Sequence, residues 1–183
     1  MLRYIFRLAL TFSLIVALLA LVGFALPRSY RVVRGIEVGA PPDAVYPHVG
    51  DLARWREWSP WAGSDPRLEA KYSAATAGAG AWAEWRSENH GDGRAELTEA
   101  QPPERVRYRM SFAGAAVPTE GAFELVATGG GRGTHITWTS EARLGWNPLT
   151  RWLGILLRRA ESQGMERGLV SLRDHAEKAS PRG

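Results

Sequence analysis

Apolar and polar residues alternate through the middle of the chain, and this period of two predicts a series of β-strands. In the segment 105–112, one face carries Val106, Tyr108, Met110 and Phe112, and the other carries three arginines and a serine. Similar segments, separated by glycine-rich turns, predict strands at 30–38, 67–74, 80–88, 93–100, 104–112, 119–127 and 134–142. We therefore expect a seven-stranded antiparallel sheet with one dry face and one solvated face.

The period changes to between three and four residues elsewhere, which predicts helices. Two short helices are expected after the first strand, at about 43–49 and 51–58, and the second ends at Ser59 because a residue before proline avoids the α-helical region. A long C-terminal helix is expected to begin at Pro148, with Asn147 as its N-cap. Only this helix is long enough to cover the dry face, so the predicted fold class is α+β.

Three tryptophans, Trp55, Trp58 and Trp61, fall within seven residues where the second short helix meets the next strand. Tryptophan buries a large apolar area and carries one N–H group that needs a partner. We expect Trp55 to pack under the short helix, and Trp58 and Trp61 to lie between that turn and the long helix. Two interpretations remain open, a plug that closes one end of the core and an aromatic gate over a cavity.

The N-terminal segment 8–26 carries no charge over 19 positions. A helix of this length nearly matches a hydrocarbon core of roughly 30 Å, which predicts a transmembrane anchor. The alternative is a cleaved signal sequence, with Arg3 and Arg7 as its basic region, although this apolar run is longer than usual. The expected organisation is an anchor or signal at 1–28 and a domain at 29–183. The signal-like arrangement favours a single-pass protein with the domain on the exported side.

Charge and composition exclude several classes of function. The 183 residues carry 23 basic and 19 acidic side chains, and two of the positive charges, Arg3 and Arg7, precede the apolar segment. The rest is nearly balanced, so no nucleic-acid partner is expected. The row Arg105, Arg107 and Arg109 is expected to face solvent and to pair with glutamates of the next strand, with lipid headgroups as the alternative partner.

Sites that depend on reactive or metal-binding residues receive no support from the sequence. The chain has no cysteine, which excludes disulfides, thiolate chemistry and cysteine-bound metals. The histidines lack metal-ligand spacing; they are His48, His90, His135 and His175. The sequence also lacks a phosphate-binding loop and a nucleophile motif. We expect no metal and no cofactor, and no catalytic constellation can be named.

Four segments resemble the START-like superfamily, also called SRPBCC, and specifically its polyketide cyclase/dehydrase-like branch. They are IEVGAPPDAVYPHVGDLARWREWSPW (36–61), GDGRAELTEAQPPERVRYRMSF (91–112), GRGTHITWT (131–139) and NPLTRW (147–152). The resemblance covers the chain from about Tyr30 to the last helix. It implies the helix-grip fold, in which a curved seven-stranded antiparallel sheet wraps around the long C-terminal helix and leaves a cavity between them.

Large apolar and aromatic residues are expected to line that cavity. The candidates are Trp58, Trp61, Trp85, Leu97, Tyr108, Met110, Phe123, Ile136, Trp138, Trp152 and Leu156. Such a lining predicts a partner that is a hydrophobic small molecule or lipid. The first alternative is an enzyme resembling polyketide cyclases or dehydratases, with Tyr108 as a hydrogen-bond donor and a base that the sequence does not identify. The second alternative is a structural or interaction module with a filled core.

Overall fold

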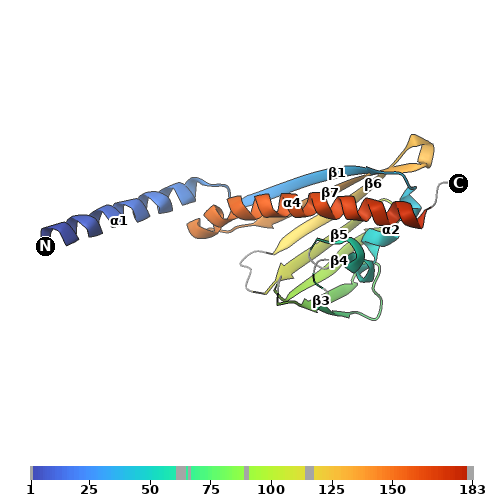
Figure 1. Cartoon of the computed structure of the whole chain (residues 1–183), viewed down its shortest axis with the longest axis horizontal. Helices are drawn as coiled ribbons and strands as arrows, with labels where there is room; N and C mark the ends of the chain where they lie inside the picture. The colour runs from blue at the N-terminus through green and yellow to red at the C-terminus, as the bar shows by residue number, and fades with distance from the viewer. Residues whose placement is uncertain (1, 61–64, 66, 89–90, 114–117, 181–183) are drawn as a thin grey trace.

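The structure is a computed structural model of the chain that describes all residues except 1, 61–64, 66, 89–90, 114–117 and 181–183. Its strands form one antiparallel sheet in the order β1-β7-β6-β5-β4-β3-β2 (Figure 1). The strands are β1 (Ser29–Val38), β2 (Glu69–Tyr72), β3 (Trp82–Arg86), β4 (Gly93–Gln101), β5 (Arg105–Phe112), β6 (Thr119–Thr128) and β7 (Gly133–Arg143). The predicted seven-stranded sheet is therefore confirmed.

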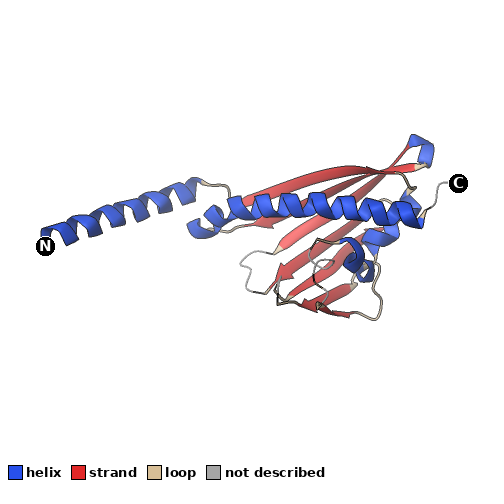
Figure 2. Ribbon diagram, in the orientation of Figure 1, coloured by secondary structure: helices blue, strands red, loops and turns tan. Residues whose placement is uncertain are grey.

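Four α-helices and two short 3-10 helices complete the described fold. The helices are α1 (Leu2–Ala25), α2 (Pro42–Gly50), α3 (Trp55–Trp58) and α4 (Pro148–Ala179), and the 3-10 turns are η1 (Leu52–Arg54) and η2 (Gly129–Gly131). Figure 2 shows α4 lying across one face of the sheet, with the short helices beside its C-terminal part. Asn147 caps α4 by accepting a hydrogen bond from the Leu149 amide at 2.9 Å, as expected.

The solvated face of the sheet carries the predicted arginine row. Arg105 and Arg107 approach Glu99 of β4 at 2.8 and 3.2 Å, and Arg109 approaches Glu120 of β6 at 3.5 Å. Two of the three ion pairs thus join β5 to the preceding strand rather than to the following one. The expected pairing with the following strand is confirmed for Arg109, whereas Arg105 and Arg107 pair with the preceding strand because β5 has a hydrogen-bonded neighbour on each side.

The N-terminal helix α1 extends away from the sheet (Figure 1). Among the residues that the structure describes, one helical segment, Arg3–Ala25, is long and apolar enough to cross a bilayer. This property belongs equally to membrane anchors and to signal sequences. The fold alone therefore establishes an exposed apolar N-terminal helix.

Candidate functional site

Five aromatic side chains pack together between the sheet and the helices on its inner face. Phe123 lies at the centre, 4.9 Å from the ring of Trp138, 5.7 Å from Tyr108, 5.8 Å from Trp58 and 6.0 Å from Trp55. These separations fall in the range of favourable aromatic pairs. We call Trp55, Trp58, Tyr108, Phe123 and Trp138 the aromatic cluster. Its central ring is fully buried, so the middle of the interior is filled by protein.

The short helices are fixed to the aromatic cluster through their tryptophans. The indole N–H of Trp55 donates to the carbonyl of Val49 at 3.0 Å, and that of Trp58 donates to the carbonyl of His48 at 2.8 Å. Both tryptophans are almost fully buried. Their polar groups are therefore satisfied by α2 while their rings cover the sheet. Trp61, the third tryptophan of the motif, lies outside the described residues.

Tyr108 carries the one phenol group of the aromatic cluster. The indole N–H of Trp138 donates to the Tyr108 hydroxyl at 2.8 Å. Burial raises the pKa of Tyr108 above its ordinary value, the hydrogen bond from Trp138 opposes the shift, and the charge of Glu161 adds to it. The hydroxyl thus stays protonated and keeps a proton that it can donate.

A carboxylate enters the same interior from α4. The hydroxyl of Ser140, on β7, donates a short hydrogen bond to Oε1 of Glu161. The second carboxylate oxygen, Oε2, is shielded from solvent and has no hydrogen-bond partner among the described residues. Tyr30 of β1 lies close enough for Glu161 to raise its pKa, although burial is the larger cause. Tyr30, Ser140 and Glu161 form what we call the polar cluster.

Glu161 was not predicted as a site residue because the apolar stripe of α4 indicated a different inward face. The residues of the first half of α4 that are buried are Arg151 and Gly154, and Glu161 follows Gly154 by seven residues, or two helical turns. The same spacing leads from Glu161 to the buried Gly168. A signal was present in the sequence, since the segment 158–164 carries no large apolar residue and interrupts the expected stripe.

The candidate cavity residues divide into three groups in the structure. Eight are buried in one apolar core; they are Trp58, Trp85, Leu97, Tyr108, Met110, Phe123, Ile136 and Trp138. Trp61 lies outside the described residues. Trp152 and Leu156 are 36% and 64% exposed, so their expected place against the sheet is corrected. At this point of α4 the inward position is occupied by Gly154, where an added Cβ atom would clash with the Leu144 side chain.

Trp152 instead faces the N-terminal helix. Its indole N–H donates to the carbonyl of Leu19 at 3.0 Å. One turn nearer the C-terminal end of α1, Gly23 leaves room for Pro148, because a Cβ atom on Gly23 would lie 2.6 Å from the Pro148 side chain. The buried guanidinium of Arg151 donates to the carbonyl of Phe24 at 2.6 Å, close to the same end of α1. The first turns of α4 are therefore attached to the last turns of α1.

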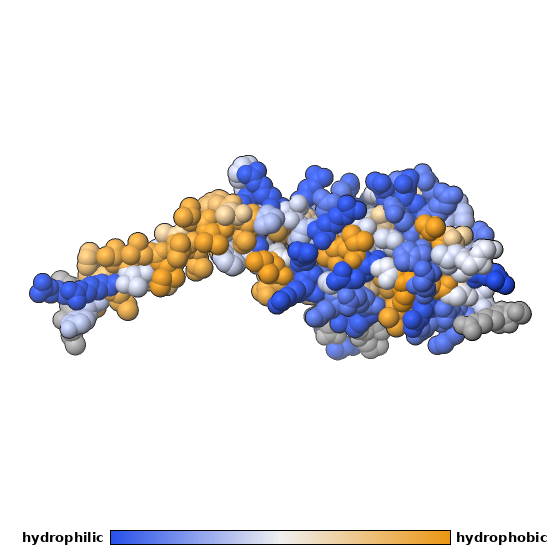
Figure 3. All heavy atoms as spheres, turned by 90° about the horizontal axis from the view of Figure 1, so that it is seen from above, coloured by the Kyte–Doolittle hydropathy of each residue, from blue (hydrophilic) through white to orange (hydrophobic). Residues whose placement is uncertain are grey.

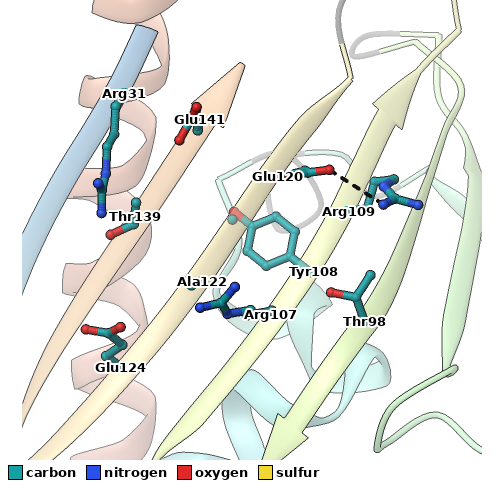
Figure 4. A pocket seen from close by; sticks show the side chains of 11 residues that line it. Arg31, Thr98, Arg107, Tyr108, Arg109, Glu120, Ala122, Glu124, Thr139 and Glu141 are labelled. Carbon is teal, nitrogen blue, oxygen red and sulfur yellow. Dashed lines mark ion pairs between the residues drawn. The ribbon is translucent and has the colours of Figure 1, made fainter. Parts of the chain in front are cut away.

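The outer face of the sheet has a hollow of different character. It is lined by three arginines and three glutamates, Arg31, Arg107, Arg109, Glu120, Glu124 and Glu141, together with Tyr108 and several smaller residues (Figure 4). Figure 4 shows the ion pair between Arg109 and Glu120 at its edge. Opposite charges are interspersed, so this hollow suits neither an apolar molecule nor an anion of high charge.

Metal binding receives no support from side-chain geometry. Among the residues that the structure describes, no three His, Asp or Glu side chains gather in an arrangement that would hold a metal ion. His48 is buried beside α3, with its Nδ1 atom 3.8 Å from a Glu57 oxygen. His135 is paired with Glu37 at 2.8 Å on the surface.

Comparisons with solved structures agree with the fold. A protein from Chromobacterium violaceum has 21% identity and a TM-score of 0.57, with 86% of this chain and 100% of that chain covered. Norcoclaurine synthase from Thalictrum flavum has 11% identity and a TM-score of 0.62, covering 88% and 94%. The Aha1 protein of Colwellia psychrerythraea has 17% identity and a TM-score of 0.56, covering 83% and 99%. At these identities the likeness concerns the fold alone.

Comparisons of sequence identify the family. No functionally curated protein matches the chain. The family model described as polyketide cyclase / dehydrase and lipid transport matches residues 29–177, which is most of the chain and includes the sheet and nearly all of α4. The chain therefore belongs to the polyketide cyclase/dehydrase and lipid transport family, with a helix-grip fold and an additional apolar N-terminal helix.

Proposed function

We propose that this chain is a single-pass membrane protein whose domain, residues 29–183, binds a hydrophobic small molecule or lipid between the sheet and α4. The family includes both lipid transport and polyketide chemistry, which supports an apolar ligand. The observation that carries the proposal is Glu161, whose side chain lies beside the aromatic cluster and has one solvent-shielded oxygen, Oε2, with no hydrogen-bond partner among the described residues. Buried polar groups normally have partners, and a ligand's polar group would supply one.

The expected position of the ligand follows from how α4 is packed. The C-terminal half of α4 is held against the sheet by Met165, Leu169, Leu172 and Ala176, all buried. The aromatic cluster fills the centre beside them. The first half of α4 has fewer buried side chains, so the proposed site lies there. The polar cluster would bind the ligand's hydroxyl or amine, and the aromatic cluster would form the apolar wall.

The test is native mass spectrometry of the full chain purified in a mild detergent, followed by extraction of bound molecules. Glu161→Gln removes the charge and keeps the shape, so we expect it to retain less of the bound molecule than the unmodified chain. Glu166→Gln is the matched control because Glu166 lies on the same helix, is 58% exposed and pairs with Arg34 on the surface. Lipid bound around α1 is expected equally in the unmodified chain and in both variants, so it does not affect the comparison between them.

Each outcome has a definite meaning. Loss of the bound molecule in Glu161→Gln, with retention in Glu166→Gln, supports the proposed site. Equal retention in all three proteins places any ligand elsewhere. A complete absence of interior molecules, also after incubation with total membrane lipid, would favour the structural module with a filled core, to which the tight packing around Phe123 already lends weight.

A second candidate function, an enzyme, is favoured by the presence of an acid and a base group on the same side of the sheet. Tyr108 is a protonated donor, and Glu161 is a carboxylate linked to the same sheet face through Ser140. A cyclase or dehydratase needs such a donor and such a base. In norcoclaurine synthase, a protein of this fold, two aromatic molecules, dopamine and hydroxybenzaldehyde, are bound. Loss of water from the extracted molecule during incubation with the protein, abolished in Glu161→Gln, would establish a dehydratase.

The proposed location of the domain is the exported side of the membrane. Arginines flank both ends of α1, Arg3 and Arg7 at one end and Arg28, Arg31 and Arg34 at the other, so the charge rule does not decide the orientation. The signal-like arrangement of the N-terminus favours export. The absence of cysteine permits a direct test with Val126→Cys, an exposed position on β6. Labelling by a membrane-impermeant maleimide in intact cells supports export, and labelling only after lysis contradicts it.

A further inference from the structure

The first ten residues of α4, 148–157, expose large apolar side chains on most of their circumference. The exposed residues are Leu149, Trp152, Leu153, Ile155, Leu156 and Leu157. The members of this segment that turn inward are Arg151 and Gly154, both buried. A helix that is apolar nearly all round is normally surrounded by apolar material, and exposed apolar patches of this kind mark contact surfaces. We call these six side chains the apolar collar.

The apolar collar is continuous with the surface of α1. Trp152 belongs to the collar and also donates its indole N–H to Leu19 of α1. Pro148, at the start of the same segment, lies against Gly23. Figure 3 shows the apolar surface of α1 continuing onto the adjoining end of the domain. Whatever surrounds the last turns of α1 therefore also reaches the collar.

Basic and aromatic residues border the collar. Arg158 and Arg159 follow it directly along α4, and Arg143 ends the strand that leads to α4; all three are exposed. The guanidinium of Arg28 lies 3.4 Å from the ring centre of Trp146, and this tryptophan is 68% exposed. Tryptophan and arginine are the residues typical of the membrane–water interface, where arginine also attracts anionic lipid.

We propose that the apolar collar is a second membrane-contacting element, which lies in the interfacial layer of the same bilayer that α1 spans. The occupant of this surface is thus lipid, with anionic headgroups at Arg158 and Arg159. The inference rests on the proposed anchoring by α1 and adds to it. Glu161 follows the collar by one helical turn, so the proposed ligand site would begin at the level of the headgroups and draw its ligand from the bilayer.

The cysteine-free chain permits a direct depth measurement. Single cysteines replace Leu153 and Leu156 in the collar, Ile15 in the middle of α1, and two exposed control positions, Val170 of α4 and Val126 of β6. Each full-length variant carries a nitroxide label and is reconstituted into vesicles of equal parts phosphatidylcholine and phosphatidylglycerol. Electron paramagnetic resonance then compares the accessibility of each label to apolar oxygen and to a water-soluble nickel complex.

We expect labels at 15, 153 and 156 to favour oxygen, and labels at 170 and 126 to favour nickel. Val170 is a matched control because it lies on the same helix and its 43% exposure is close to the 48% of Leu153. A label at 15 in lipid with labels at 153 and 156 in water would overturn this inference and leave the anchor intact. A label at 15 in water would overturn the anchor itself, and the inference with it.

A second copy of the chain is the competing occupant, and the same labels detect it. Labels at 153 and 156 that are shielded from both oxygen and nickel, with spin–spin broadening that disappears on dilution with unlabelled protein, would show a contact between copies. That result would overturn the assignment to lipid. Oxygen access without such broadening supports it.

Discussion

Gly121 lies directly opposite Tyr108 on the neighbouring strand, and the phenol ring occupies the space that any other side chain would need. A Cβ atom at Gly121 would lie 2.5 Å from Cε1 of the Tyr108 ring. This pair positions the hydroxyl group that Trp138 contacts. The geometry of the aromatic cluster therefore depends on the absence of one side chain.

Gly121→Ala is expected to destabilise the fold by roughly 1–3 kcal/mol, because the added methyl group overpacks a buried position. The measurement is urea unfolding of the full chain in detergent. Gly164→Ala is the control, since among the described residues its Cβ would meet Pro60 alone, at an ordinary 3.8 Å. This control should gain up to about 1 kcal/mol from the better helix propensity of alanine. Equal stabilities of the two variants would contradict the close contact.

Tyr108→Phe should change the alkaline stability of the protein. The folded state holds the pKa of Tyr108 above its unfolded value of about 10, so the unfolded chain releases this proton first as the pH rises. The free energy of unfolding therefore falls above about pH 10, by up to about 1.4 kcal/mol per pH unit for this residue. In Tyr108→Phe that slope should be shallower, and stability at neutral pH should drop by about 1 kcal/mol through the lost hydrogen bond.

His48→Leu should remove part of the acid sensitivity. Burial, followed by the nearby charge of Arg54, lowers the pKa of His48, while Glu57 opposes the shift. Below about pH 6.5 the unfolded chain thus binds a proton that the folded chain does not, and stability falls on acidification. Unfolding measured between pH 7 and pH 5 should show a smaller decrease in His48→Leu. An unchanged decrease would assign the acid sensitivity to carboxylates.

Arg151→Gln should loosen the attachment of α1 to the domain. The Arg151 guanidinium donates to the carbonyls of Phe24, Leu26 and Gly145, and hydrogen bonds from a charged donor typically contribute about 1.5–3 kcal/mol. Trypsin cleaves after arginine, so limited proteolysis should cut after Arg28 faster in this variant. Arg158→Gln, at an exposed position of the same helix, should cut at the parental rate. No acceleration in Arg151→Gln would mean that other contacts hold α1.

The alternation of apolar and polar residues, together with the glycine-rich turns, predicted the strands because most strands bury one face against the core. The segment expected to alternate most clearly was predicted as a strand at 104–112, and it forms β5, Arg105–Phe112. The ion-pair partner of Arg107 was not predictable in the same way. Hairpin order places a strand on each side of β5, and the sequence alone does not say which neighbour supplies the glutamate.

The first half of α4 was predicted less well, for a physical reason. Apolar side chains normally mark the face of a helix that packs on its own domain, and here Leu149, Trp152 and Leu156 are exposed while Arg151 and Gly154 turn inward. An apolar stripe does not identify what it will contact. Glu161 was missed for the same reason, because the apolar stripe indicated a different inward face of α4, although the interruption of that stripe at 158–164 was a signal.

The short link between α1 and β1 limits how the domain can work. Three residues, 26–28, separate the two elements, and three extended residues span only about 10 Å. Arg151 shortens the usable length further by binding Phe24 and Leu26. If α1 spans a bilayer as proposed, a domain joined to it by so short a link stays close to that bilayer. Delivery of a ligand to a second membrane would thus require a separate, diffusing acceptor that comes to this domain.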